Sequence, residues 1–337
     1  MQTIFVVDDA GINLTQAENA LEGVYNVITF SSAPKMFVIL ERVTPDLILL
    51  DIEMPEMNGF AALEKLIANE RTANIPVIFF TASIDNNTEA HGLELGAVDF
   101  ITKPFSPIVL RHRIAHQLHI NDIIKKRTER IEDLQNNIIF VLADMVESRD
   151  KETSGHVERT TIYIQIMIEA MQERGLYQEK MRGWDKEVMV LSARLHDIGK
   201  ISISDLILNK PSKLSSEEFE VMKTHSSEGE RIIDQIIART SGEMFLQHAK
   251  LFAGYHHENW DGSGYPHKLK GEGIPLQGRI MAIADVYDAL VSVRPYKKRF
   301  SHEEAVAIIM EDVGKKFDPK IAEVFFEVSD KFKKVKA

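Results

Sequence analysis

The stretch Leu47-Ile48-Leu49-Leu50-Asp51 sets a short, continuous apolar run directly before a carboxylate. Four more short apolar runs surround it, at residues 4–7, 27–30, 77–80 and 98–101. Amphipathic patterns with helical spacing lie between these runs, near residues 12–22, 34–42, 59–69 and 87–94. Buried strands that alternate with helices are typical of a parallel sheet covered on both faces. Residues 1–105 therefore predict an α/β domain with a five-stranded, doubly wound parallel sheet.

Polar residues follow four of the five predicted strands. Asp8 and Asp9 come after the first strand, Asp51 after the third, and Thr81 and Lys103 after the last two. Ligands of such sheets bind beyond the carboxyl ends of the strands. Three carboxylates there suit Mg²⁺ and leave coordination positions open for a phosphoryl group. The threonine hydroxyl and the lysine ammonium would then hold phosphate oxygens.

Further features of this half resemble a known regulatory domain. Met54-Pro55, Asn58-Gly59 and Lys103-Pro104 accompany the polar residues, and together residues 2–120 resemble a response-regulator receiver domain with the flavodoxin-like fold. The resemblance implies that Asp51 is the phosphoacceptor, that Asp8 and Asp9 assist Mg²⁺ binding, and that Thr81, Phe100 and Lys103 form the switch. It also implies a cognate histidine kinase as phosphoryl donor and a cis bond before Pro104. A solvated sheet edge would explain any one of these acids, but not five suitable residue types at strand ends.

Size and charge narrow the other possibilities. A chain of 337 residues predicts about two domains. Residues 1–105 hold five Lys or Arg against fifteen Asp or Glu, which disfavours DNA as a partner. The chain contains no run of eighteen apolar residues, so the sequence predicts no membrane span. The start of the chain lacks the basic region of a secretory signal, and cysteine is absent, so we expect a cytoplasmic protein.

The segment from Ser106 to about Met145 contains no glycine and predicts one long helix. Two rows recur every seven residues: Leu110, Gln117, Ile124, Ile131, Ile138 and Met145, and Ile114, Asn121, Thr128, Gln135 and Leu142. Such rows indicate a coiled coil, and hence a homodimer, although a plain amphipathic helix docked on its own chain is the alternative. We therefore expect a first domain at 1–120, a linker helix at 121–145 and a second domain at 146–337.

The second domain has helical periodicity nearly throughout. Apolar residues recur at three- and four-residue steps in 157–172, 187–195, 217–223, 229–238 and 278–292, and a glycine-rich loop over 257–276 interrupts them. These patterns predict an all-α domain whose site is built from several facing helices.

Two motifs in this domain carry chemistry. They are His196-Asp197-Ile198-Gly199-Lys200 and His256-His257-Glu258-Asn259-Trp260-Asp261-Gly262-Ser263-Gly264-Tyr265-Pro266. Imidazole nitrogen and carboxylate oxygen suit Fe, Mn, Zn or Ni. On a helix, His196 and Asp197 would diverge by about 100° and could bridge two metals. Glu152 and His156 stand four apart and would share one helical face if the helix begins early enough.

These motifs resemble those of the HD-GYP family of cyclic di-GMP phosphodiesterases, and the resemblance covers roughly residues 140–325. It implies a set of metal ligands: Glu152, His156, His196, Asp197, His225, His256, His257 and Asp285. It implies substrate contacts from Lys200, Gly264, Tyr265, Arg294, Lys297 and Asp150, with Asp197 and Lys200 as the catalytic residues. The remaining histidines, and Trp260, are expected to be packing or surface residues.

The resemblance implies hydrolysis of cyclic di-GMP to the linear dinucleotide pGpG, and onward to GMP in some members. Two or three Fe or Mn ions would serve the reaction, with other divalent metals as alternatives, because paired metals can activate water and clamp a phosphodiester. Phosphorylation of Asp51 would regulate the site through the 106–145 helix. Two alternatives stay open: a mixed cyclic GMP–AMP as substrate, and a non-catalytic signalling module, which would often have lost ligands.

Overall fold

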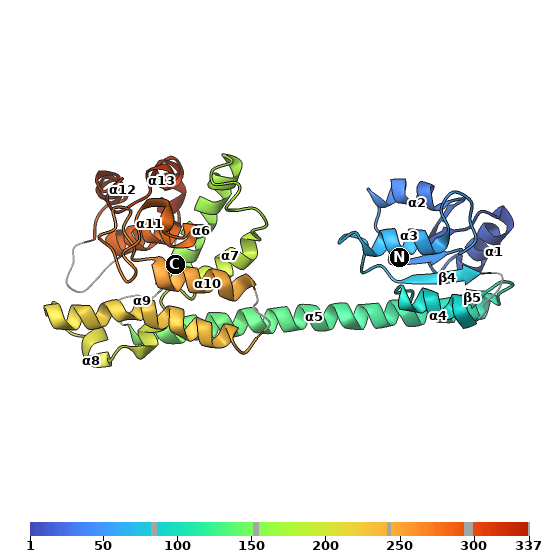
Figure 1. Ribbon diagram of the computed structural model, residues 1–337, viewed down its shortest axis with the longest axis horizontal. Helices are drawn as coiled ribbons and strands as arrows, with labels where there is room; N and C mark the ends of the chain where they lie inside the picture. The colour runs from blue at the N-terminus through green and yellow to red at the C-terminus, as the bar shows by residue number, and fades with distance from the viewer. Residues whose placement is uncertain (82–85, 151–154, 241–243, 293–298, 336–337) are drawn as a thin grey trace. The chain divides into compact units, whose positions relative to one another are not determined.

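The computed structural model describes residues 1–81, 86–150, 155–240, 244–292 and 299–335, without the side chains of residues 86 and 87. The chain divides into two compact units, Met1–Ile131 and Glu132–Ala337 (Figure 1). Among the residues that the structure describes, no helix is long and apolar enough to cross a membrane. The cytoplasmic location stays a prediction.

The first unit contains the expected parallel sheet. Its strands are β1 (Thr3–Val7), β2 (Asn26–Phe30), β3 (Leu47–Leu50), β4 (Val77–Thr81) and β5 (Asp99–Thr102). They lie in the order β2-β1-β3-β4-β5, and every pairing is parallel. This order brings the carboxyl ends of β1, β3, β4 and β5 to adjacent places along one edge. The predicted α/β, doubly wound fold is confirmed.

Helices cover both faces of this sheet because successive strand residues point to opposite sides. On one face, Phe5, Ile48 and Phe79 pack against α2 (Ala33–Leu40) and α3 (Gly59–Ile67). On the other, Ile4 and Phe80 pack against α1 (Gly11–Leu21) and the start of α5 (Pro107–Arg149). The remaining helix, α4 (Asn86–Glu94), follows β4.

The long helix predicted after this domain is α5, which runs unbroken over 43 residues. Leu110 and Ile114 are buried in the core of the first unit, and Ala143 and Val146 are buried near the other end. Between them, Ile124, Ile131 and Ile138 of the predicted heptad row are 56%, 56% and 55% exposed. The row is thus buried at Leu110 and exposed at these three isoleucines, and the choice between a coiled coil and a helix docked on its own chain stays a prediction.

The regular elements described in the second unit are helical, as expected: α6 (His156–Glu173), α7 (Lys186–Ala193), η1 (Ile198–Ser202), α8 (Asp205–Leu208), α9 (Ser216–Ile237), α10 (Met244–Tyr255), η2 (Gly271–Gly273), α11 (Leu276–Val291), α12 (His302–Glu311) and α13 (Pro319–Lys333). The patterns expected at 217–223 and 229–238 form one helix, α9. It begins at a capping box in which Ser215 and Glu218 bond each other's backbone N–H groups.

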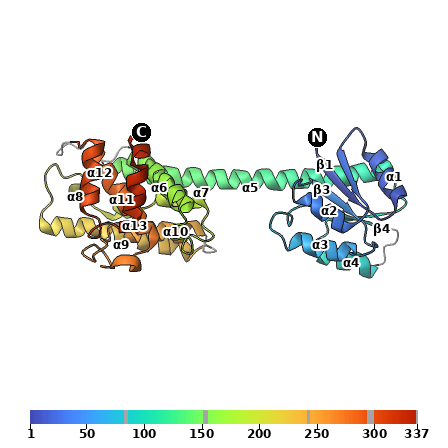
Figure 2. The same ribbon diagram turned by 90° about the horizontal axis from the view of Figure 1, so that it is seen from above.

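The core of the second unit joins α6, α11 and α13. The Tyr163 and Phe332 rings stack with centroids 4.4 Å apart, and Tyr287 meets both edge-on. A smaller cluster joins the end of α5 to α9 and α10, through Ala143, Ile233 and Ala253. Helices α9 and α10 lie side by side in both views (Figures 1 and 2). These two clusters fix the positions of the helix ends that carry the candidate site.

Candidate metal centre

Five segments far apart in the sequence bring seven of the predicted ligands together. His156 is the first residue of α6, His225 lies in α9, and Asp285 lies in α11. His256 and His257 directly follow α10, where the glycine-rich loop begins. His196 and Asp197 lie on a turn between α7 and η1, so the expectation that they share a helix was wrong.

The first ligand group consists of His156, His196 and Asp285, whose donor atoms lie within 4.8 Å of one another. The Nε2 atoms of His156 and His196 are 3.2 Å apart. A carboxylate oxygen of Asp285 lies 3.5 Å from Nε2 of His156. Both imidazoles are buried, so the group turns two nitrogens and one anionic oxygen toward a single point.

The second ligand group consists of His225, His256 and His257, also with donor atoms within 4.8 Å of one another. Here the Nε2 atoms of His225 and His256 are 3.2 Å apart. The ring of His257 lies 4.1 Å from the ring of His256 and 4.9 Å from that of His225. This group contains three imidazoles and no carboxylate of its own.

Asp197 lies between the two groups and reaches both. One of its carboxylate oxygens is 3.5 Å from Nε2 of His196, in the first group. The other is 3.5 Å from Nε2 of His225 and 3.8 Å from Nε2 of His256, in the second. Two oxygens of one carboxylate therefore face two ligand groups, which is the bridging arrangement expected from sequence, although a turn rather than a helix provides it.

The protonation of the histidines shows that these groups fit a cation. The Nδ1 atoms of His196, His225 and His256 lie 2.8–3.0 Å from backbone carbonyl oxygens, which can only accept. Nδ1 of His156 lies 2.8 Å from the Asp288 carboxylate. Each Nδ1 therefore carries the proton in the neutral ring, and each Nε2 presents a lone pair. Two lone pairs 3.2 Å apart repel each other unless a cation lies between or beside them.

Burial keeps most of these rings neutral. It lowers the pKa of His225 and of His256 to about 4, and it also lowers the pKa of His196 and of His257. Burial acts in the same direction on His156, but the hydrogen bond to Asp288 and the nearby carboxylates outweigh it and raise the pKa. Neutral imidazole is the form that binds a metal, so most of the set is ready to bind at neutral pH.

Lys200, on η1, lies beside the carboxylate that faces both groups. Its Nζ is 2.9 Å from Asp197 and 2.9 Å from Asp150. Burial lowers the pKa of Lys200, but these two carboxylates outweigh it and raise the pKa above its ordinary value. The lysine is therefore a fixed cation. Burial raises the pKa of Asp197, but Lys200 and the surrounding histidines hold it well below its usual range.

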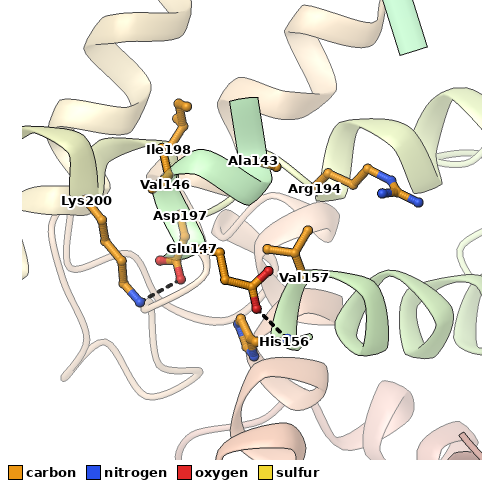
Figure 3. A pocket seen from close by; sticks show the side chains of 9 residues that line it. All are labelled: Ala143, Val146, Glu147, His156, Val157, Arg194, Asp197, Ile198 and Lys200. Carbon is orange, nitrogen blue, oxygen red and sulfur yellow. Dashed lines mark hydrogen bonds and ion pairs between the residues drawn. The ribbon is translucent and has the colours of Figure 1, made fainter. Parts of the chain in front are cut away.

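A small cavity beside this carboxylate is lined by Asp197 and Lys200 together with Glu147 and Val146 near the end of α5 (Figure 3). Glu147 accepts a 2.6 Å hydrogen bond from the backbone N–H of His156. Arg149 donates to the backbone carbonyls of Ile201 and Ile203 on either side of the η1 terminus. Sequence reasoning assigned no role to Glu147 or Arg149, because their contacts depend on where α5 ends in the fold.

Two glycines allow close approaches at the site. A Cβ on Gly199 would lie 1.8 Å from the carbonyl oxygen of His225, so only glycine lets η1 pack onto α9 there. A Cβ on Gly264 would lie 2.2 Å from the backbone nitrogen of Asn259. Glu258, another residue that sequence reasoning missed, is buried and accepts three backbone N–H groups of residues 267–269. The glycine-rich loop is thus folded tightly against the ligand segment, and the Tyr265 ring lies 4.8 Å from that of His257.

Three predicted site residues, Glu152, Arg294 and Lys297, lie outside the described residues, and α6 begins only at His156. The histidines expected to serve packing include His248, which accepts from Gln277, and His302, which bonds the Tyr287 hydroxyl. Trp260 packs near the Arg279 guanidinium, in line with its expected packing role.

The phosphoacceptor pocket expected in the first unit lies at the carboxyl edge of the sheet. Asp8, Asp9 and Asp51 bring carboxylate oxygens within 4.8 Å of one another. Nζ of Lys103 is 2.5 Å from Asp8 and 2.9 Å from Asp51. Burial raises the pKa of Asp51, although the Lys103 ammonium opposes the shift. The Lys103–Pro104 bond is cis, as expected.

Thr81 ends β4 and is buried, and Phe100 is buried in β5 with its ring 5.3 Å from that of Phe79. The structure therefore gathers the acids and Lys103, and it places both other switch residues on the neighbouring strands. Their roles in switching stay predictions.

Comparison with known families matches both units. A family described as the response regulator receiver domain matches residues 4–115, and a family described as the HD domain matches residues 140–321. The second match covers more than half of the chain.

Three curated relatives illustrate the range of similar proteins. A "Probable cyclic di-GMP phosphodiesterase" of Vibrio cholerae is 38% identical over 96% of this chain and 77% of its own. The "Cyclic di-GMP phosphodiesterase response regulator RpfG" of Xanthomonas campestris is 35% identical over 94% of this chain and 85% of its own. A "3'3'-cGAMP-specific phosphodiesterase 2" of Vibrio cholerae is 36% identical over 61% of this chain and 37% of its own.

Proposed function

The chain belongs to the HD-domain family and carries a response-regulator receiver domain before it, and from this premise we propose that it is a metal-dependent phosphodiesterase that hydrolyses cyclic di-GMP. The observation that carries the proposal is Asp197, whose two carboxylate oxygens face two separate imidazole groups. The full-length relatives named as cyclic di-GMP phosphodiesterases support the choice of substrate.

The HD family implies a divalent metal, and the two ligand groups fit one each. We propose Fe or Mn, since mixed imidazole and carboxylate donors suit both. His156, His196 and Asp285 would hold one ion, the second group would hold another, and Asp197 would contact both. We also propose that Glu152 would be a ligand of a third ion, as in some members of the family that the motifs resemble. Bound metals would supply Lewis-acid activation of the phosphodiester and of the attacking water.

The protein's own residues add charge and position. Lys200 is a fixed cation beside Asp197, so it offsets negative charge that develops on the phosphoryl oxygens rather than donating a proton. Asp150 contacts the same ammonium at 2.9 Å. We propose substrate contacts from Gly264 and from Tyr265, whose ring lies 4.8 Å from that of His257. We propose that Arg294 and Lys297 add further substrate contacts, as in the family that the motifs resemble. The product would be pGpG, with GMP after a second cleavage.

A second candidate substrate is the mixed cyclic GMP–AMP. A relative that is 36% identical over 61% of this chain is named as specific for 3'3'-cGAMP. Parallel turnover assays of the two cyclic dinucleotides, on one Fe- or Mn-loaded preparation, separate the candidates. We expect faster conversion of cyclic di-GMP; a preference for the mixed dinucleotide would change the substrate but keep the reaction class.

We propose that phosphorylation of Asp51 by a histidine kinase, assisted by Mg²⁺ at Asp8 and Asp9, regulates this site. One helix, α5, begins in the receiver domain and ends at Arg149, which donates to the backbone carbonyl of Ile201 in η1. The next residue, Asp150, forms an ion pair with Lys200. A change in the position of α5 would therefore move groups that contact the catalytic lysine. The route is a proposal about coupling and needs a difference in activity between the two phosphorylation states.

We further propose that the protein is a homodimer through α5. The exposed row of Ile124, Ile131 and Ile138 has the spacing of a coiled-coil seam. Replacing Ile131 by Glu should halve the mass measured by sedimentation equilibrium. Leu206, which is 85% exposed on α8, offers a matched control, because Leu206→Glu removes an exposed apolar side chain outside the row. A wild-type monomer at micromolar concentration would contradict the dimer.

A further inference from the structure

We infer that Asp288 is a positioning residue, which fixes the orientation of His156 and thereby strengthens only one of the two metal sites. The inference rests on the proposed metal centre. Asp288 lies on α11, one helical turn after the predicted ligand Asp285, and its side chain is almost fully buried. No metal-ligand role is needed for it, since its oxygens are engaged by other groups.

Asp288 is held from several directions. One oxygen, Oδ2, lies 2.8 Å from Nδ1 of His156 and also accepts from a terminal nitrogen of Arg159 at 2.9 Å. The other oxygen, Oδ1, accepts from Nε of Arg159 at 2.6 Å. The Ser292 hydroxyl donates to the same carboxylate at 3.2 Å. His156 and Arg159 stand three residues apart on α6 and so share one face toward α11. The bidentate arginine prevents the carboxylate from turning away from the imidazole.

This contact determines what His156 can bind. An ionised carboxylate can only accept, so Nδ1 of His156 keeps its proton and Nε2 directs a lone pair toward His196 and Asp285. A carboxylate partner also makes the opposite ring nitrogen a stronger ligand, and loss of such a partner typically lowers metal affinity about 10–100-fold.

The other ligand group lacks this support. His225 and His256 give their Nδ1 protons to backbone carbonyls, which are neutral and cannot be removed by a side-chain substitution. In the first group, His196 also uses a carbonyl, that of Ala193. Among the described ligand histidines, His156 is the one whose Nδ1 faces a carboxylate. A change at Asp288 should therefore weaken one metal site and leave the other intact.

The test is a Mn²⁺ titration of the chelator-treated full chain, with bound metal counted after equilibration at fixed free Mn²⁺. Asp288→Asn should bind one equivalent fewer than the wild type at limiting Mn²⁺, with affinity for that equivalent lower by about 10–100-fold. Asp318→Asn is the matched control. It breaks another buried Asp–Arg pair of the same domain, with Arg279 at 2.6 Å, but Asp318 contacts no predicted ligand. The control should retain the wild-type number of equivalents even if it melts at a lower temperature.

Arg159→Lys provides a second variant should Asp288→Asn fail to fold. It keeps a positive charge but loses the planar fork, so it should weaken the same equivalent by a smaller factor. Wild-type affinity for every equivalent in a folded Asp288→Asn protein, or in Arg159→Lys if only that variant folds, would overturn the role of Asp288 alone. A wild-type protein whose HD ligands bind no Mn²⁺ or Fe²⁺ would instead overturn the metal centre on which the role rests.

Discussion

The receiver pocket and the metal centre both gather carboxylates around a lysine, but they are built in different ways. In the receiver, Lys103 lies 2.5 Å from Asp8 and 2.9 Å from Asp51, and the three residues follow strands of one sheet, β5, β1 and β3. In the metal centre, five separate segments supply the ligands, and imidazole nitrogens face each other at 3.2 Å. The Lys103 ammonium already neutralises part of the negative charge of the receiver carboxylates. The facing imidazole lone pairs of the metal centre, by contrast, repel each other unless a cation is bound.

The largest effect should come from the close approach that assembles the metal centre. Gly199→Ala places a methyl group 1.8 Å from the His225 carbonyl oxygen and 2.5 Å from the backbone nitrogen of Gly229. We expect a loss of at least about 1–3 kcal/mol in unfolding free energy, together with loss of bound metal. Gly273→Ala meets nothing within 4 Å and should behave as the wild type. Urea unfolding and metal analysis of both variants check this, and a stable, metal-loaded Gly199→Ala protein would contradict the packing described.

The two lysines give the next test of the comparison. Lys200→Met should lower turnover by about 10²–10³-fold, because a fixed cation beside the reacting phosphoryl group is lost. Its metal content should stay close to that of the wild type, since Lys200 is not a ligand. Lys103→Met in the receiver should leave unphosphorylated turnover unchanged. Equal losses in the two variants would mean that Lys200 has no direct part in the reaction.

Acid should destabilise the metal-free protein through the imidazoles. His225 and His256 have a folded pKa of about 4, below the value of about 6.5 in the unfolded chain. Their stabilising contribution is thus present above pH 6.5 and is lost as the pH falls toward 4. His156, with a raised pKa, has the opposite sign, but its contribution changes above pH 6.5.

The melting temperature of chelator-treated protein should therefore fall by several degrees between about pH 7 and about pH 5. In the double variant His225→Asn, His256→Asn, the melting temperature should depend less on pH. A wild-type melting temperature that is flat over this interval would contradict burial of neutral imidazoles.

The smallest effect on basal turnover should come from the phosphoacceptor. Asp51→Ala removes the proposed phosphorylation site but leaves every described metal ligand in place, so unphosphorylated activity should be unchanged. A small phosphoryl donor should alter the activity of the wild type and have no effect on the variant. Such an effect persisting in Asp51→Ala would refute regulation through this residue.

The same contrast explains how much could be predicted from sequence. The residues of the receiver pocket could be predicted because each follows an apolar run, and the carboxyl ends of parallel strands meet at one edge of the sheet. The ligands of the metal centre could be named only through resemblance, because His156 meets His196 across 40 residues and His225 meets His256 across 31. Asp288 stands in a plain helical pattern, and nothing in that pattern identifies its partner. The helix expected at His196 and Asp197 was wrong: both lie on a turn before η1, and η1 packs onto α9 through Gly199, a contact that local spacing does not reveal.

The central claim is tested most directly by turnover of cyclic di-GMP by anaerobically purified, Fe- or Mn-loaded protein, with metal quantified in the same sample. Asp197→Ala, which removes the carboxylate that faces both ligand groups, is the paired variant. We expect linear pGpG from the wild type and none above background from Asp197→Ala. No product from a fully loaded wild type, or equal product from a cleanly loaded Asp197→Ala protein, would contradict a phosphodiesterase built on this centre.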